Sequence, residues 1–421
     1  MKRALPWLAW TAVALIAAIA LVAALNLRDE SPLDERDGLQ GTPEQVARGA
    51  YLARAGNCIA CHTMRGGAPY AGGRAIETPF GTVFGSNITP DVKTGIGGWS
   101  ASHFWRAMHN GRSKDGRFLV PAFPYTNFTL VTREDSDALF AYLRSLPAIE
   151  QPNRAHTLRF PYDTQAALAV WRALAFTPGV FEPDRAQSAE WNRGRYLVRG
   201  LGHCNACHGS RNVLGATSGS LEMSGGVSPI DKWYAPSLLA SAEAGVADWE
   251  TQHIVDLLKT GVSARGSAIG PMAEVVFRST QHLDDADLRA MAVFLKSLPQ
   301  SAPRARRDPA PMAPETAERG RALYREHCEG CHGPRGEGAR GAYSALAGNR
   351  SVVMNPPANV IRAVLGGGFQ PATAGNPRPW GMPPFGHVLD DADTAAVVTF
   401  IRTQWGNRAA PVSATDVQRM R

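Results

Sequence analysis

The stretch Cys58-Ile59-Ala60-Cys61-His62 is the part of this chain around which the rest is organised. Two later stretches repeat its spacing: Cys204-Asn205-Ala206-Cys207-His208 and Cys328-Glu329-Gly330-Cys331-His332. The chain has 6 cysteines, and these three stretches contain all of them. The sequence therefore leaves no cysteine for a disulfide or for a separate structural zinc site.

Two thiols separated by two residues and followed at once by a histidine form the attachment pattern of c-type haem. The thiols form thioethers to the porphyrin edge, and the histidine is the proximal iron ligand. We therefore predict three covalently bound haem c groups. The predicted attachment residues are Cys58, Cys61, Cys204, Cys207, Cys328 and Cys331, and the predicted proximal ligands are His62, His208 and His332.

Paired cysteines also occur in redox dithiols and in zinc sites. Thioredoxin-like dithiols belong to a βαβ pattern, which this sequence lacks. A zinc site would need two cysteine pairs around one metal and would leave the three trailing histidines unexplained. The haem interpretation accounts for every residue of the pattern.

Length and charge are compatible with this interpretation. A chain of 421 residues suggests about three domains. The formal net charge is +7, but the basic residues are dispersed, so the sequence does not predict a nucleic-acid partner. Arginine forks suit carboxylates, and each haem brings two propionates, so we assign part of the excess charge to propionate pairing.

Residues 1–30 are predicted to be a membrane anchor or signal segment. Lys2 and Arg3 precede an uncharged run from Ala4 to Leu27, and about 20 helical residues cross a bilayer core. We expect a retained transmembrane helix in the inner (cytoplasmic) membrane, with the haem domains facing the periplasm. A cleaved signal peptide is the alternative. Export is expected either way, because bacteria attach haem covalently outside the cytoplasmic membrane.

A repeat surrounds each haem motif. Similar lead-in segments precede the motifs: Ala47-Arg48-Gly49-Ala50-Tyr51-Leu52, Asn192-Arg193-Gly194-Arg195-Tyr196-Leu197 and Glu318-Arg319-Gly320-Arg321-Ala322-Leu323. The glycine precedes the first cysteine by nine, ten and eight residues. Amphipathic helices are expected to close the repeats at Asp135–Leu146, Asp284–Leu298 and Asp390–Trp405.

A lead-in helix, a haem motif and a closing helix are the plan of a class I cytochrome c domain. The predicted fold class is therefore all-α, with three tandem class I cytochrome c domains plus an N-terminal transmembrane helix. A helix at Ala166–Phe176 is expected to pack between the first two domains. The predicted boundaries are 1–30 for the anchor or signal, 43–150 for domain 1, 151–187 for a linker with this packing helix, 188–300 for domain 2, 301–314 for a Pro/Arg linker, 315–407 for domain 3 and 408–421 for a tail.

Methionine is the usual sixth ligand in this class of domain. Met382 follows Trp380-Gly381 and precedes Pro383, and Met272 follows Gly270-Pro271. Both lie before a closing helix, so we predict that they ligate the iron in repeats three and two. Met354 and Met223 compete for these roles and are expected to pack in the core instead.

The first repeat carries a group of motifs that form a signature. They are Thr78-Pro79-Phe80-Gly81-Thr82, Asn87-Ile88-Thr89-Pro90-Asp91, Thr94-Gly95-Ile96-Gly97, His109-Asn110-Gly111 and Pro121-Ala122-Phe123-Pro124-Tyr125. This signature resembles the triheme cytochrome c subunit of bacterial membrane-bound dehydrogenases. The family serves alcohol, gluconate, sorbitol and aldehyde dehydrogenases, and molybdenum hydroxylases such as those acting on nicotinate or isoquinoline. The resemblance spans residues 43–405.

The resemblance implies an electron-transfer subunit of an oxidoreductase complex that is not an enzyme on its own. Electrons would pass from a partner dehydrogenase to quinone, a small cytochrome or a terminal oxidase. A molybdenum hydroxylase is the favoured partner, because an N-terminal anchor looks more like the subunits paired with those enzymes, and a flavin or quinoprotein dehydrogenase is possible. The alternatives are a peroxidase-like haem enzyme using an open coordination site at haem 1, or a membrane tether.

The first repeat departs from the family at Phe123. Relatives commonly have methionine at this place in the loop before the closing helix, and phenylalanine cannot ligate iron. Three outcomes are open for haem 1: no sixth ligand, Met108, or His109. We expect an iron without methionine ligation, with Met108 packed in the core beside Phe104.

Overall fold

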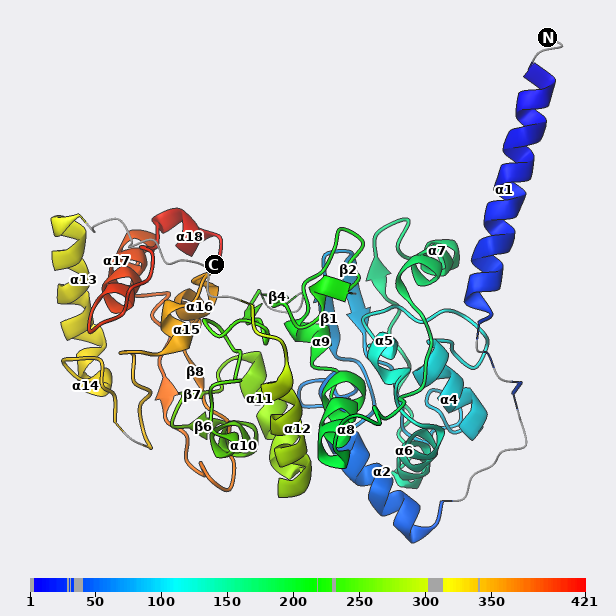
Figure 1. Ribbon diagram of the computed structural model, residues 1–421, viewed down its shortest axis with the longest axis horizontal. Helices are drawn as coiled ribbons and strands as arrows, with labels where there is room; N and C mark the ends of the chain where they lie inside the picture. Colours follow the sequence, from blue (N-terminus) through cyan, green and yellow to red (C-terminus); the bar gives the residue numbers. More distant parts are fainter. Residues whose placement is uncertain are drawn as a thin grey trace.

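The computed structural model arranges the three repeats in a row (Figure 1). The first and third repeats lie at opposite ends and the second lies between them. The structure describes residues 4–28, 30, 32–33, 41–217, 219–228, 232–301, 313–339 and 341–421, without the side chains of 4–9. Most of the linker predicted at 301–314 falls outside these ranges.

Each repeat begins with a lead-in helix and ends with a closing helix. The first repeat contains α2 (Pro43–Ala55), α3 (Cys58–Cys61), β1 (Ala75–Thr78), β2 (Gly81–Phe84), α4 (Ala101–Asn110), α5 (Tyr125–Phe128) and α6 (Arg133–Ser145), and is followed by β3 (Thr157–Leu158) and α7 (Gln165–Ala175). The second contains α8 (Ala189–Arg195), η1 (Tyr196–Leu201), α9 (Asn205–His208), η2 (Gly219–Leu221), β4 (Gly226–Val227), β5 (Tyr234–Ala235), α10 (Thr251–Thr260), β6 (Val262–Ser263), β7 (Gly266–Ser267), α11 (Pro271–Arg278), η3 (Thr280–His282) and α12 (Asp285–Ser297). The third contains α13 (Pro314–His327), α14 (Glu329–His332), α15 (Arg350–Val353), α16 (Ala358–Gly366), β8 (Gly368–Phe369), β9 (Gly381–Met382), α17 (Asp391–Thr403) and α18 (Ala414–Gln418).

The closing helices α6, α12 and α17 confirm the amphipathic pattern in the sequence. A polar side chain caps the start of each one by accepting a hydrogen bond from the backbone N–H three residues on. The caps are Thr132, Asp284 and Asp390. Acidic residues fill each first turn, where they complement the helix dipole.

The repeated glycine of the lead-in segments is explained by the crossing of two helices. In every repeat the lead-in helix passes so close to the closing helix that a Cβ on the glycine would overlap a backbone carbonyl oxygen. The contacts are Gly49 with Ala138, Gly194 with Ala290 and Gly320 with Ala396. Only glycine allows the two backbones to approach this closely.

The arginine before this glycine is bound to the closing helix. Arg48, Arg193 and Arg319 each donate from Nε to an aspartate, at distances of 2.8, 2.7 and 2.8 Å. The aspartates are Asp135, Asp287 and Asp393, each in the first turn of its closing helix. The ion pair fixes the rotation of one helix against the other.

The second lead-in segment is one residue longer than the first between its glycine and its cysteine. Its helix α8 continues into a π-helical turn, η1, before Cys204. A π-helical turn takes up one extra residue without breaking the helix. The length difference seen in the sequence is thereby absorbed, and the haem motif keeps its place at the helix end.

The prediction of an all-α fold was wrong. The described residues include four small antiparallel sheets, namely β1-β2-β3, β4-β5, β6-β7 and β8-β9. These strands lie in glycine- and proline-rich connections, where two to four paired residues leave no period-2 pattern in the sequence. The hairpin β6-β7 precedes Met272, and Met382 lies on β9.

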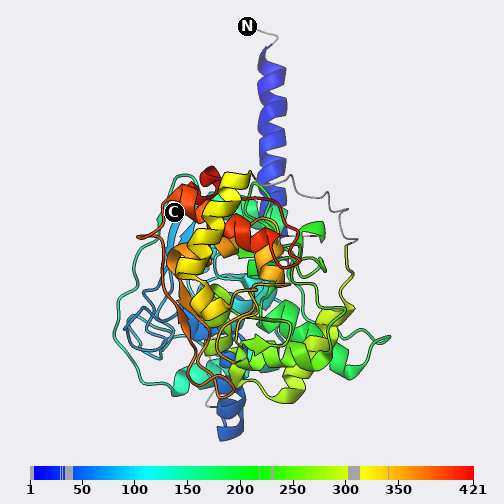
Figure 2. The same cartoon turned by 90° about the vertical axis from the view of Figure 1, so that its left-hand side faces the viewer.

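The prediction of an N-terminal transmembrane helix was also wrong. Among the residues that the structure describes, no helix is long and apolar enough to cross a membrane, a crossing that takes about 20 apolar residues. The run beginning at Ala4 does form a helix, α1 (Ala4–Asn26), which projects from the first repeat (Figures 1 and 2).

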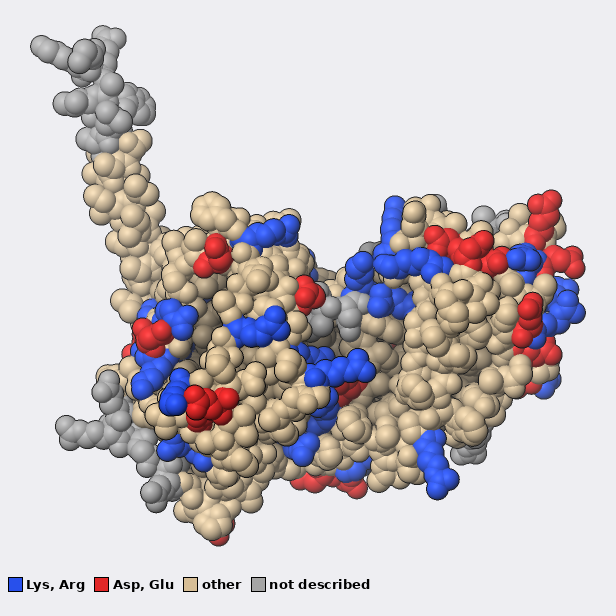
Figure 3. Space-filling model, turned by 180° about the vertical axis from the view of Figure 1, so that it is seen from behind, with Lys and Arg blue, Asp and Glu red and all other residues tan. Residues whose placement is uncertain are grey.

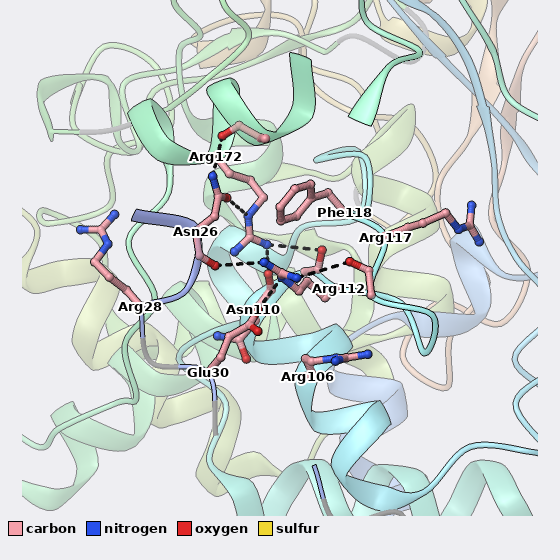
Figure 4. Close-up of polar contacts among 12 residues, drawn as sticks. Asn26, Arg28, Glu30, Arg106, Asn110, Arg112, Arg117, Phe118 and Arg172 are labelled. Carbon is pink, nitrogen blue, oxygen red and sulfur yellow. Dashed lines mark hydrogen bonds and ion pairs between the residues drawn. The ribbon is translucent and has the colours of Figure 1, made fainter. Parts of the chain in front are cut away.

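The last turn of α1 belongs to the folded body (Figure 4). Asn26 is buried; its Nδ2 donates to the Ala169 carbonyl at 2.9 Å, and its Oδ1 accepts from Arg172 Nε at 3.0 Å. Arg172 also donates to the Asn110 carbonyl, and Arg112 pairs with Glu30 beside it. This polar cluster joins the end of α1 to α4 and α7.

Helix α7 is the helix expected between the first two domains. Its Trp171 donates from Nε1 to the Leu214 carbonyl of the second repeat at 2.8 Å, and the same ring packs edge-on against Tyr125 of the first. The helix therefore contacts both repeats, and it also packs against α1. Val170 and Leu174 remain exposed on its outer face.

The first two repeats share one hydrophobic core, whereas the third has its own. Two tyrosines of the lead-in helices cross between the first two repeats. Tyr51 donates to Asp287 Oδ2 at 2.7 Å, and Tyr196 donates to Asp135 Oδ2 at 2.6 Å. In each contact the same tyrosine of one repeat binds the same aspartate of the other, so repeats one and two form a reciprocal pair. The corresponding residue of the third repeat is Ala322.

The third repeat is joined to the second mainly by polar contacts. Arg350 donates to both oxygens of Asp248, at 3.1 and 2.9 Å, and the hydroxyls of Ser267 and Ser344 lie 2.9 Å apart. Seen from behind, the outline narrows between this repeat and the rest, and acidic and basic side chains are interspersed over the visible face (Figure 3).

The residues 408–421, predicted to be a tail, include α18, which packs against α17 and buries Val417.

Replacing Tyr51 or Tyr196 with Phe is expected to lower the free energy of unfolding by about 1–3 kcal/mol, because each change removes a hydrogen bond to a buried carboxylate. Urea unfolding of the full, haem-loaded chain measures the effect. Tyr162→Phe is the matched control, because that side chain is exposed. Equal unfolding midpoints for all three variants would show that the crossed tyrosines do not stabilise the pair.

Candidate haem sites

The three cysteine pairs lie in short helical turns directly after the lead-in helices. All six cysteines are free of disulfides. Burial raises the pKa of Cys58 and Cys204 to about 12 and that of Cys328 to about 11. Redox-active or zinc-binding cysteines need thiolates, which a raised pKa disfavours. Within the described residues, no group of three or more His, Cys, Asp or Glu side chains could hold a metal ion.

Each motif histidine is oriented by a backbone carbonyl. The Nδ1 atoms of His62, His208 and His332 lie 2.7, 2.7 and 2.9 Å from carbonyl oxygens. The acceptors are Ser86, Pro236 and Ser344, which follow their histidines by 24, 28 and 12 residues. Because a carbonyl can only accept, the proton lies on Nδ1 and the Nε2 lone pair is available for iron.

The charge state of these histidines also suits a metal ligand. Burial lowers the pKa of His62, His208 and His332, which favours the neutral imidazole. Neutral imidazole is the form that coordinates a metal. The donor set of each motif, two free thiols beside an imidazole with a fixed Nδ1 proton, therefore fits a covalently attached haem.

A glycine holds the backbone of each motif histidine. The carbonyls of His62, His208 and His332 accept hydrogen bonds from backbone N–H groups at 2.8, 2.7 and 2.8 Å. The donors are Gly72, Gly225 and Gly338, all in the left-handed region with φ of 82°, 79° and 66°. Sequence reasoning missed these glycines and the three acceptor carbonyls, because their distance from the motif differs in each repeat.

The signature of the first repeat has a structural role next to this site. Asn87 is buried directly after Ser86, the residue that orients His62. Its side chain donates to Thr94 Oγ1 at 3.0 Å and to the Ile149 carbonyl at 2.8 Å. The Asn-Ile-Thr-Pro-Asp motif thus ties the loop bearing the Ser86 carbonyl to the segment after the closing helix.

The two predicted methionine ligands both lie at the edge of a core. Met272 is the second residue of α11 and packs, half-buried, against the core shared by repeats one and two. Met382, on β9, packs against the core of the third repeat. The competing Met223 and Met354 are fully buried, and Met223 donates its N–H to Asn205 inside the second motif. Ligation by Met272 and Met382 stays a prediction.

The three alternatives for haem 1 occupy different surroundings. Phe123 is half-buried, with its ring centroid 5.3 Å from that of Phe128. Met108 is buried in the shared core. His109 lies against Trp105 with ring centroids 4.5 Å apart, and its Nδ1 is 2.9 Å from the Thr129 carbonyl. Met108 and His109 therefore both have packing roles without iron.

Comparison with known proteins agrees with this geometry. The cytochrome c family model matches residues 46–147 and 317–405. The chain is 38% identical over 396 residues to the cytochrome c subunit of alcohol dehydrogenase (quinone) from Gluconobacter oxydans (strain 621H), covering 89% of this chain and 82% of that protein. It is 37% identical over 400 residues to the gluconate 2-dehydrogenase cytochrome c subunit of Pantoea cypripedii, covering 91% and 90%.

A third relative is a nicotinate dehydrogenase subunit of Pseudomonas putida (strain KT2440), which is 41% identical over 364 residues. The match covers 85% of this chain but only 30% of that protein, so the chain spans about a third of that relative's length.

Paired thiols, oriented histidines and crossed helices define the class of c-type cytochromes. The chain belongs to the cytochrome c family, among the cytochrome c subunits of dehydrogenases. Its cofactor is covalently bound haem c, and it is an electron-transfer protein without catalytic activity of its own.

Phe123→Met is expected to add a methionine–iron bond at haem 1. The methionine-to-iron charge-transfer band of the oxidised protein should then rise by about half, from two haems to three, and the potential of haem 1 should rise. Phe128→Met is the matched control, because it replaces the neighbouring phenylalanine with methionine and leaves Phe123 in place. A wild-type band already worth three haems would contradict the expectation and point to Met108.

Proposed function

We propose that this chain is a triheme subunit that accepts electrons from a partner dehydrogenase and passes them to quinone, a small cytochrome or a terminal oxidase. The observation that carries the proposal is the equivalence of the three sites. Each has a histidine whose ring Nδ1 faces a carbonyl and whose own carbonyl is held by a left-handed glycine. Haem supplies one-electron redox chemistry at such sites.

The residues of the chain have the tasks of holding and shielding the cofactors. The cysteine pairs attach them, His62, His208 and His332 ligate the iron, and Met272 and Met382 complete two of the sites. The crossed helices and the two cores fix the sites relative to one another. We further propose that the haem domains lie outside the cytoplasmic membrane, facing the periplasm, because bacteria attach haem c there.

The favoured partner is a molybdenum hydroxylase. This choice is supported by the identity to the nicotinate dehydrogenase subunit, 41%, which exceeds the 38% and 37% shared with the alcohol and gluconate dehydrogenase subunits. A flavin or quinoprotein dehydrogenase is the alternative partner.

Replacing Cys204 and Cys207 with Ala is expected to remove one third of the covalently bound haem, because each cysteine pair holds one haem. Pyridine haemochrome absorbance per mole of protein measures the loss. The matched control replaces Ser210 and Ser224, which lie near the same motif but form no thioether. An unchanged haem content in the cysteine variant would refute the assignment of the second site.

Purification of the native complex through a tag on this chain tests the function itself. Addition of the partner's substrate without oxygen is expected to reduce the haems, as followed by their visible absorbance. A partner containing molybdenum would support a molybdenum hydroxylase. A partner containing flavin or a quinone cofactor would identify a flavin or quinoprotein dehydrogenase instead, and the electron-transfer role would stand. Haems that stay oxidised while the partner turns over with an artificial acceptor would contradict that role.

A further inference from the structure

Helix α11 carries the predicted sixth ligand of haem 2, and it contacts both its own repeat and the first repeat. It has 8 residues and no side-chain hydrogen bond at its N-terminal cap, and only Ala273 and Val276 are buried. Isolated helices of this length are marginal in water, so a helix this short depends on its packing. The helix packs against η3 and α10 of its own repeat and also against α3, the haem-attachment turn of the first repeat.

The first turn of α11 is bound to the first repeat by a two-pronged ion pair. Arg74 donates from Nη1 to Glu274 Oε1 at 2.6 Å and from Nη2 to Glu274 Oε2 at 3.0 Å. Glu274 follows Met272 by two residues. Bidentate arginine–carboxylate pairs fix geometry as well as charge, and both side chains are about two-thirds shielded from solvent, with exposures of 32% and 34%.

Arg74 is itself attached to the first haem motif. Its carbonyl accepts a hydrogen bond from Gly85 N–H at 2.9 Å, and Gly85 lies against the Cys61 carbonyl so closely that a Cβ would overlap it. The ion pair therefore lies beside the first haem motif.

The far end of α11 is bound to the first repeat as well. Ser279, the residue after the helix, is buried and donates from Oγ to the Ala55 carbonyl at 3.3 Å. Ala55 is the last residue of α2. Each end of the short helix thus has a polar contact with the neighbouring repeat.

We propose that Arg74 of the first repeat is a positioning residue for haem 2, holding α11 so that Met272 stays on the iron. The inference rests on the ligand assignment made under the proposed function. It implies that coordination in the second site depends on a side chain from the first. Arg278 provides a matched control, because it also binds Glu274, at 2.9 Å, but lies on α11 itself and cannot fix that helix to the first repeat.

The test is an imidazole titration of the full-length, haem-loaded protein, followed by loss of the methionine-to-iron charge-transfer band. A Met382→Ala background makes the band report Met272, and a Met272→Ala background makes it report Met382. The double variant Met272→Ala/Met382→Ala sets the baseline. Arg74→Gln, Glu274→Gln, Arg74→Lys and Arg278→Gln are then compared in both backgrounds.

In the Met382→Ala background, Arg74→Gln and Glu274→Gln are expected to lower the imidazole concentration for half displacement about two- to fivefold, the range for losing a partly exposed ion pair. Arg74→Lys should restore most of the difference, and Arg278→Gln should cause none. In the Met272→Ala background none of the four should have an effect, which separates positioning from general destabilisation.

Two results would overturn the proposal, and they differ. Equal titrations for Arg74→Gln, Arg278→Gln and the parent protein would show that Arg74 does not position the ligand. If the charge-transfer band of the Met382→Ala protein is no stronger than that of the double variant, Met272 is not the ligand, and the inference has no basis. In either case the electron-transfer function is judged separately, by haem reduction in the native complex.

Discussion

The close crossing of the lead-in and closing helices is the constraint on which every haem site in this chain depends. At Gly49, Gly194 and Gly320 the two backbones touch, so a side chain of any size would push the helices apart. The arginine one residue earlier fixes their rotation by its ion pair with the closing helix. Since each cysteine pair follows the lead-in helix directly, this crossing also places the thiols and the histidine.

Much of this arrangement could be predicted because its causes are local. The attachment motif is defined by thiol and imidazole chemistry within five residues, and the closing helices by the spacing of apolar residues along one face. Their starts were predicted less exactly: Asp284 caps α12 where that helix was expected to begin, whereas α6 is capped by Thr132, before the expected start at Asp135. The repeated glycine was visible in the sequence, but its reason, a backbone contact, needed the structure.

The remaining features depend on contacts that leave no local pattern. The Ser86, Pro236 and Ser344 groups that orient the histidines are backbone carbonyls, and any residue has one. The strands that overturned the all-α prediction are too short to show an alternation of apolar and polar residues in the sequence. The expected N-terminal transmembrane helix failed for a different reason, because composition alone does not show where a helix becomes part of the folded body, as α1 does at Asn26.

The alanine at position 322 has a consequence for how the chain is assembled. A methyl group cannot donate the hydrogen bond that Tyr51 and Tyr196 give to their neighbours' aspartates, so the third repeat lacks that means of pairing. The first two repeats therefore form a reciprocal pair, and the third is attached to the second by other contacts, such as the ion pair of Arg350 with Asp248. A third repeat with a different haem potential could replace the present one, provided that it kept this ion pair.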